Sequence, residues 1–250
     1  MQDGRINYNR ASMLGCSIDQ VDMRQTLLRI GELIEQGDPA IVITLNAEII
    51  YRALENPKLR SIINRAALVT PDGVGVIWAG KILGLVFPER VTGIDLLHVL
   101  CGQAAVKQWR IFLLGAAPQV AEQAAKRLMD EYPGLMICGF RDGYFSEQEE
   151  AALLEDINGT RPDIVAVALG SPKQEYWMDK HQQAIKTSVM LGVGGSLDVL
   201  AGIKKRAPDW VIRMNLEWLY RLICEPSRWR RQLVLPMFVI RVIKSKYFDG

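Results

Sequence analysis

The chain has 250 residues, of which 49% are hydrophobic and 23% are charged, and its net charge at pH 7 is +2. This length allows one large domain or one domain with an appendage, and the apolar content excludes disordered and collagen-like chains. The charge is uneven, because residues 203–250 carry +7 and residues 1–202 carry −5. A basic tail indicates an anionic partner, which could be nucleic acid, phosphate or an acidic membrane surface.

The cysteines and the first thirty residues bear on the compartment. Four cysteines are too few and too widely spaced for a disulfide framework or a paired zinc site. They are Cys16, Cys101, Cys138 and Cys224. Seven charged side chains interrupt the first thirty residues, unlike the apolar run of a signal peptide. We therefore expect reduced thiols and a cytoplasmic protein.

Short β-branched runs alternate with longer helical patterns, which is typical of βα units in a mostly parallel sheet. Several runs are apolar throughout, as expected for strands that are covered on both faces. The expected strands are residues 13–17, 40–45, 67–70, 110–114, 135–139, 163–169 and 188–193.

Apolar residues spaced by three and four predict helices between these strands. The expected helices are residues 23–35, 47–54, 74–83, 95–106, 119–131, 147–158 and 172–181. The pattern predicts an α/β fold with a Rossmann-like, mostly parallel sheet flanked by helices.

The character of the sequence changes after Gly202, where a basic connector leads into aromatic and arginine-rich helical patterns. We expect an α/β catalytic domain over residues 1–202 and a basic helical appendage over residues 203–250. Residues 233–243 are apolar except for Arg241, and eleven residues are fewer than the ~20 that span a bilayer. A helix in the membrane interface and a helical pair packed on the sheet both fit this pattern, and nucleic-acid binding fits less well.

Functional groups are expected where the strands end, because helix N-termini and loop amides meet the carboxyl edge of a parallel sheet. Polar or glycine-rich segments follow five of the expected strands. These segments are residues 44–46, 70–75, 115–118, 170–175 and 192–196.

Individual residues in or near these segments suggest chemistry, and each has a plainer alternative. Asp72 could accept a proton as a general base, although Pro-Asp-Gly is also an ordinary turn and the two roles are compatible. Arg90 could bind a phosphate or be an ordinary surface arginine.

Three segments could likewise bind a ligand or serve only the local fold. Segments 115–118 and 192–196 fit either a diphosphate site or tight turns that need small residues. Lys173, Gln174 and Glu175 are either three polar groups at a site or the solvated first turn of a capped helix.

Other types of site have little support in the sequence. Residues 75–81 match a P-loop by count, but Ile82 stands where a magnesium-binding Ser or Thr is needed. The sequence has no GxGxxG after a strand, no histidine pair at metal-ligand spacing and no Asp-x-Asp. We expect metal-independent chemistry without a cofactor.

Five motifs, in their order and spacing, resemble the WecG/TagA/CpsF glycosyltransferase family. They are Thr44-x-Asn46, Pro71-Asp-Gly-x-Gly75, Arg90-Val-Thr-Gly-Ile-Asp95, Gly115-x-x-Pro118 and Gly170-Ser-Pro-Lys-Gln-Glu175. The resemblance covers residues 13–200, and the arginine-bearing tail is similar to that of the TagA branch. Leu45 stands where relatives often have proline.

The resemblance implies inverting transfer of N-acetylmannosamine from UDP to undecaprenyl-diphospho-N-acetylglucosamine, for teichoic acid linkage units, at the inner membrane face. It implies that Asp72 is the general base and that Arg90 meets the departing diphosphate. It assigns contacts with sugar hydroxyls to Thr44 and Asn46, and a donor contact to Gln174. The arginines that the tail would bring over the pocket are Arg221, Arg228 and Arg231.

Alternative functions stay open. The protein could transfer UDP-ManNAcA or another UDP-sugar to a lipid-linked acceptor, or be a non-catalytic module that binds UDP-sugar or lipid. The carboxylate of Asp72 favours an enzyme, because binding a diphosphate gains nothing from an added negative charge. A nicotinamide oxidoreductase has less support. We expect peripheral attachment to an anionic membrane surface and no nucleic-acid partner, and a homo-oligomer stays open.

Overall fold

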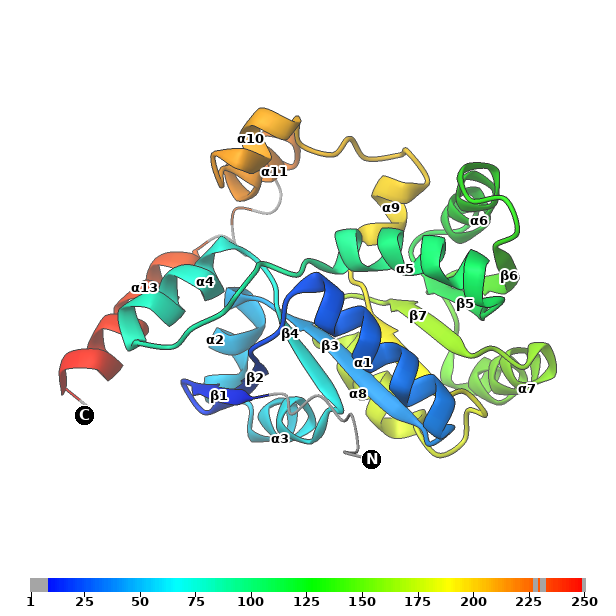
Figure 1. Cartoon of the computed structure of the whole chain (residues 1–250), viewed down its shortest axis with the longest axis horizontal. Helices are drawn as coiled ribbons and strands as arrows, with labels where there is room; N and C mark the ends of the chain where they lie inside the picture. Colours follow the sequence, from blue (N-terminus) through cyan, green and yellow to red (C-terminus); the bar gives the residue numbers. More distant parts are fainter. Residues whose placement is uncertain (1–8, 227–228, 230–232, 249–250) are drawn as a thin grey trace, which may run out of the picture.

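The centre of the molecule is a six-stranded sheet whose neighbouring strands all run parallel (Figure 1). The computed structural model describes residues 9–226, 229 and 233–248. The strands are β3 (Ala40–Leu45), β4 (Leu68–Pro71), β5 (Arg110–Gly115), β6 (Met136–Arg141), β7 (Ile164–Ala168) and β8 (Val189–Gly192). Their spatial order is β4-β3-β8-β7-β5-β6. The predicted α/β fold is confirmed.

Helices cover both faces of the sheet, because side chains alternate along each buried strand. Ile41 and Ile43 of β3 join one core cluster, whereas Val42 joins the other. The first face carries α2 (Ala47–Glu55), α3 (Pro57–Arg65), α4 (Val74–Leu83), α7 (Glu150–Thr160) and α8 (Lys173–His181). The second face carries α1 (Met23–Gln36), α5 (Gly93–Lys107), α6 (Val120–Glu131) and α9 (Ser196–Leu200). A short 3₁₀ turn, η1 (Glu147–Glu149), leads into α7.

Two asparagines set the helix boundaries beside β3. The side-chain oxygen of Asn46 accepts a hydrogen bond from the Ile49 N–H at 3.0 Å, which caps α2 directly after the strand. Asn56 ends α2, and its side-chain oxygen caps α3 by accepting from the Leu59 N–H at 3.0 Å. Pro57 occupies the first turn of α3, where its missing N–H costs no hydrogen bond. The sequence pattern did not predict α3.

The predicted strand over residues 13–17 is wrong. The chain turns inside it and forms an antiparallel hairpin of β1 (Arg10–Met13) and β2 (Cys16–Asp19) outside the large sheet. Leu14 and Gly15 make the turn with φ values of 50° and 81°. The hairpin is tied to β4 because the carboxylate of Asp19 accepts a 2.7 Å hydrogen bond from the Val69 N–H.

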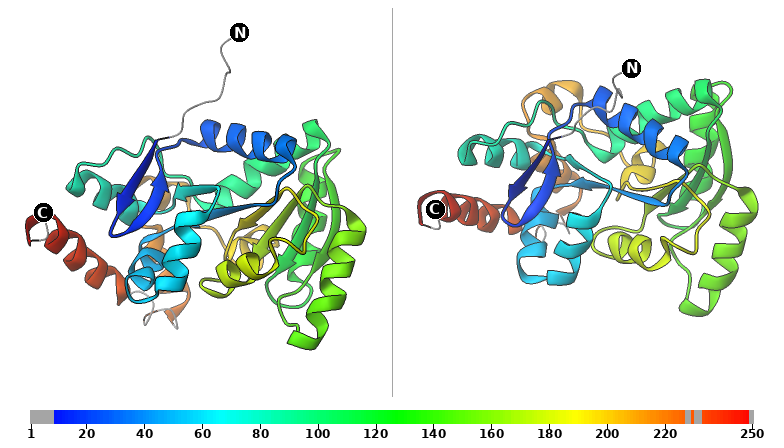
Figure 2. Two further views of the ribbon diagram at one scale, coloured as in Figure 1. Left: turned by 90° about the horizontal axis from the view of Figure 1, so that it is seen from below. Right: turned by 60° about the horizontal axis from the view of Figure 1, so that its bottom comes forward.

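The C-terminal part is helical, with α10 (Asp209–Arg213), α11 (Glu217–Cys224) and α13 (Val234–Phe248). The last of these lies against α2 and α4, at the end of the sheet opposite β6 (Figure 2). Phe238 is 1% exposed and Val242 0%, so one side of α13 belongs to the core. The opposite side exposes apolar residues such as Ile240, which is 64% exposed. In the described ranges, none of the helices has both the length and the apolar character to cross a bilayer.

Candidate active site

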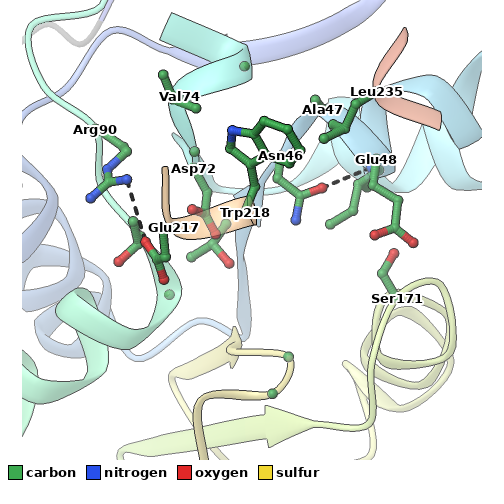
Figure 3. A pocket seen from close by; sticks show the side chains of 18 of the residues that line it. Asn46, Ala47, Glu48, Asp72, Val74, Arg90, Ser171, Glu217, Trp218 and Leu235 are labelled. Atoms are coloured by element: carbon green, nitrogen blue, oxygen red, sulfur yellow. Dashed lines mark hydrogen bonds and ion pairs between the residues drawn. The ribbon is translucent and has the colours of Figure 1, made fainter. Parts of the chain in front are cut away.

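A cavity of about 700 Å³ opens at the carboxyl edge of the sheet (Figure 3). Its floor comes from segments that follow the four adjacent strands β4, β3, β8 and β7, and α11 and α13 add a second wall. The floor includes Thr44, Asn46, Asp72, Ser171, Gln174, Gly194 and Ser196, together with Arg90 from the loop before α5. The second wall includes Glu217, Trp218, Leu235, Phe238 and Val239.

Asp72 is held at the cavity by the turn that follows β4. Its backbone N–H donates to the Leu45 carbonyl at 2.9 Å, which continues the pairing of β4 with β3. Gly73 then takes a φ of 90°, a conformation that favours glycine, and α4 begins at Val74. Asp72 is therefore both a turn residue and a cavity residue, and its half-buried carboxylate lies near the middle of the cavity (Figure 3).

Thr44 and Asn46 lie at the end of β3, and each uses part of its side chain within the fold. The buried hydroxyl of Thr44 donates to the Gly192 carbonyl at 3.0 Å, which joins the ends of β3 and β8. The oxygen of Asn46 caps α2, and its amide nitrogen points away from that cap (Figure 3). Oxygen lone pairs of Thr44 and the NH₂ group of Asn46 can therefore still meet a ligand.

Arg90 lies across the cavity from Asn46 (Figure 3). Its Nη1 is 3.6 Å from Oε2 of Glu217 on α11, and both side chains are mostly buried. The cation that the sequence predicts at the site therefore already has a carboxylate beside it.

Gln174 lies in the first turn of α8 and is almost fully buried. Its Oε1 accepts from the Gly194 N–H at 3.1 Å, and its Nε2 donates to Oε1 of Glu175 at 2.9 Å. Burial raises the pKa of the Glu175 carboxyl, and the hydrogen bond from Gln174 opposes this rise. Lys173 points elsewhere, because its Nζ donates to the Gly143 carbonyl at 3.3 Å.

The alternative of a solvated first turn for α8 is therefore wrong. Gln174 and Glu175 are both buried, and α8 begins without a side-chain cap. Of the three polar groups expected at this helix start, Gln174 is the one that lines the cavity.

The two glycine-rich segments differ in position. Gly194 and Ser196 of segment 192–196 line the cavity, whereas none of residues 115–118 does. Gly115 has a packing role, because a Cβ there would lie 2.4 Å from the Ala168 carbonyl oxygen.

In the part of the chain that the structure describes, metal-ligating side chains do not gather at the site. Within residues 9–226, 229 and 233–248, no three His, Cys, Asp or Glu side chains are placed so that they could hold a metal ion. That the chemistry needs no metal stays a prediction.

Comparison with known proteins gives the family. Residues 11–249 match the glycosyl transferase WecG/TagA/CpsF family. The chain belongs to this family. N-acetylglucosaminyldiphosphoundecaprenol N-acetyl-beta-D-mannosaminyltransferase of Bacillus spizizenii is 39% identical over 213 residues, which are 85% of this chain and 82% of the relative. The protein of the same name in Staphylococcus aureus is 33% identical over 244 residues, which are 97% and 95% of the two chains.

The structure brings together most of the residues that the WecG/TagA/CpsF resemblance indicates. Thr44, Asn46, Asp72, Arg90 and Gln174 all line one cavity. Their roles stay predictions. The three arginines of the tail cannot be placed in the same way: Arg228 and Arg231 lie outside the described residues, as does the side chain of Arg221, whose backbone belongs to α11.

The resemblance led us to expect that the tail would lie over the pocket, but sequence reasoning named none of the described side chains by which the C-terminal helices line the cavity. Glu217 and Trp218 come from α11, and Leu235 and Phe238 come from α13. The mixture of aromatic and charged residues after Gly202 was a signal for helices, but it did not indicate which side of each helix faces the cavity.

Proposed function

We propose that this protein is an inverting glycosyltransferase that moves N-acetylmannosamine from a UDP donor to undecaprenyl-diphospho-N-acetylglucosamine. Relatives named for N-acetylmannosaminyl transfer to this lipid-linked sugar match this chain over at least 82% of their own length. The observation that carries the proposal is that one cavity at the carboxyl edge holds both Asp72 and Arg90. The product would enter the linkage unit of teichoic acid.

The proposed reaction is a single displacement. An acceptor hydroxyl attacks C1 of the donor sugar, the bond between C1 and the UDP oxygen breaks, and UDP leaves with the electron pair. Asp72 takes the proton of the attacking hydroxyl as general base. One attack from the face opposite the leaving group inverts C1.

Charge develops on the diphosphate as it leaves, and positive groups around the cavity would stabilise it. Arg90 supplies a full charge at the cavity wall. Gly93 and Ile94, in the first turn of α5, also line the cavity, where the helix dipole favours an anion. Thr44 would accept hydrogen bonds from sugar hydroxyls, while Asn46 and Gln174 would donate to the substrate.

We further propose that residues 1–202 form the catalytic domain and that residues 203–250 hold it peripherally on the inner face of the membrane. Exposed apolar residues occur in and beside the C-terminal helices, in a segment that also carries the positive charge. They are Trp210, Met214, Trp218, Ile223, Trp229, Leu233, Met237, Ile240, Ile243 and Tyr247. Such a combination suits an anionic lipid surface. Arg221, Arg228 and Arg231 would then complete the donor site.

A panel of UDP-sugars tests the reaction. The purified protein is incubated with each donor and with a short-chain lipid-diphosphate analogue of the acceptor, and the products are read by mass spectrometry. A mass gain of one N-acetylhexosamine with UDP-N-acetylmannosamine is expected. A mass gain only with the uronate donor would contradict the proposed donor sugar. No gain with any donor would contradict the proposed transferase activity.

A further inference from the structure

The side-chain amide of Gln174 is held at both ends by groups of the protein. Its Oε1 accepts from the Gly194 N–H at 3.1 Å, and its Nε2 donates to Glu175 at 2.9 Å. The amide also lies tightly against β8, because a Cβ built on Gly192 would be 2.8 Å from Nε2. Gln174 therefore fastens the start of α8 to the loop over residues 192–196.

The same loop is fastened from its other side by β3. The hydroxyl of Thr44 donates to the Gly192 carbonyl at 3.0 Å. Gly194, in the middle of the loop, and Ser196, at its end, line the cavity with Gln174. The position of this part of the cavity floor thus depends on two side chains, Thr44 and Gln174. One of them, Gln174, is itself hydrogen-bonded to Glu175.

Glu175 determines which way the Gln174 amide faces. Its side chain is 0% exposed, and its Oε1 is the acceptor for Nε2. A carboxyl group offers an accepting oxygen whether it is ionised or protonated. With the amide reversed, two donors would meet at Gly194 and two oxygens at an ionised Glu175, and buried groups without a partner are costly.

We infer that Glu175 is a positioning residue of the donor site, which fixes the orientation of the Gln174 amide and, through it, the loop over residues 192–196. The inference rests on the proposed function, because the ligand expected at this part of the cavity floor is the UDP donor. Glu175 itself is not among the residues that line the cavity, so it acts through Gln174.

Two substitutions distinguish the effect of the accepting oxygen of Glu175 from the effect of its side-chain volume. Glu175→Gln keeps an accepting oxygen beside Nε2, whereas Glu175→Leu fills similar space without one. Hydrogen exchange of the peptide covering residues 192–196, followed by mass spectrometry, then reports on the Gly194 N–H in the absence of any ligand. We expect exchange about tenfold faster in Glu175→Leu and within threefold of the parent in Glu175→Gln.

Measurements of UDP binding test whether the position of this loop affects the donor site. We expect Glu175→Leu to weaken UDP binding about tenfold and to raise the donor KM by a similar factor, with kcat changed less. Glu175→Gln should restore both values to within threefold of the parent. In a Gln174→Ala background, Glu175→Leu should weaken UDP binding by less than twofold, because the amide through which it acts is gone.

Several outcomes would overturn the inference. Unchanged exchange of residues 192–196 in Glu175→Leu would do so, as would equal losses of UDP affinity by Glu175→Leu in both backgrounds, the sign of a general effect on the fold. If Glu175→Leu does not fold, Glu175→Met takes its place. The inference is also refuted if the Gly194 N–H of the parent exchanges as fast as an exposed loop amide. Failure of UDP to bind the parent protein would count against the proposed function alone, since the exchange experiment needs no ligand.

Discussion

Arg90 and Glu217 join the loop before α5 to the C-terminal helix α11, with 3.6 Å between Nη1 and Oε2. Both residues line the cavity (Figure 3). If Arg90 meets the leaving diphosphate as we propose, the diphosphate and the carboxylate of Glu217 would compete for one guanidinium. We therefore expect donor binding to be linked to the contact between α11 and the rest of the molecule.

Glu217→Gln should tighten UDP binding about threefold at low salt, because it removes an anion that competes for Arg90. A threefold change corresponds to about 0.7 kcal/mol, and we expect no more because the 3.6 Å between the charged atoms is longer than in a strong, hydrogen-bonded ion pair. Isothermal titration with UDP measures it. Glu155→Gln on α7, an exposed glutamate, makes the same change of net charge away from the cavity and should leave the affinity unchanged. Weaker UDP binding by Glu217→Gln would show that Glu217 supports the donor site.

Asp72→Asn should reduce turnover by roughly 10²–10⁴, the range typical of a lost general base, with UDP affinity within threefold of the parent. The substitution keeps the size of the side chain and the turn at Gly73, so the fold should not change. Steady-state transfer to the soluble acceptor analogue gives the turnover. Asp38→Asn changes an exposed aspartate between α1 and β3 and is the matched control. Turnover within threefold of the parent would remove Asp72 from the mechanism.

Gly192→Ala should displace the Gln174 amide, because the added methyl group would lie 2.8 Å from Nε2 and 3.2 Å from Cε of Met178. We expect UDP binding about tenfold weaker and a free energy of unfolding lower by about 1–3 kcal/mol, typical of overpacking. Gly159→Ala in α7 is the control, since nothing lies within 4 Å of its Cβ position. That substitution should stabilise the helix by about 0.5–1 kcal/mol. Denaturant unfolding and UDP titration of both variants check the pair, and an unchanged UDP affinity in Gly192→Ala would contradict the role of this contact.

The sequence predicted the bounds of a helix well where glycines stand at both of its ends. Helix α4 has the predicted bounds because Gly73 and Gly84 flank it, with φ values of 90° and 75°. The hairpin turn was missed because Leu14 adopts a positive φ that bulky residues rarely take. Helix α3 was missed because Asn56-Pro57 resembles the start of a loop, whereas Asn56 ends one helix and caps the next.

The site was predictable as far as it depends on strand order. Asn46 and Asp72 follow adjacent parallel strands, so local sequence already brings them to one edge. The burial of Glu175 depends on how α8 packs, and Trp218 reaches the cavity from a helix far along the chain. These placements come from tertiary packing, for which a single sequence has no local signal.

The membrane prediction can be tested on the exposed side of α13 without disturbing its buried side. Ile240 is 64% exposed, so Ile240→Asp should change the free energy of unfolding by less than about 0.5 kcal/mol. It should weaken binding to anionic vesicles about tenfold or more, because an Ile side chain buried in lipid contributes roughly 1.5–3 kcal/mol. Cosedimentation with vesicles rich in phosphatidylglycerol measures the loss. Val106→Asp, at an exposed apolar position near the end of α5, is the matched control and should bind as the parent does.

Salt separates the two contributions to this attachment. Each Lys or Arg near an anionic surface contributes ~1 kcal/mol and is screened by salt, whereas apolar insertion is not. The parent should therefore keep a salt-resistant fraction of bound protein that Ile240→Asp loses.

Truncation near Gly202 is a less specific test, because removing α13 uncovers the core around Phe238, and losing a buried phenylalanine alone costs about 3–5 kcal/mol. Equal binding by Ile240→Asp and the parent at every salt concentration would exclude α13 as the membrane contact.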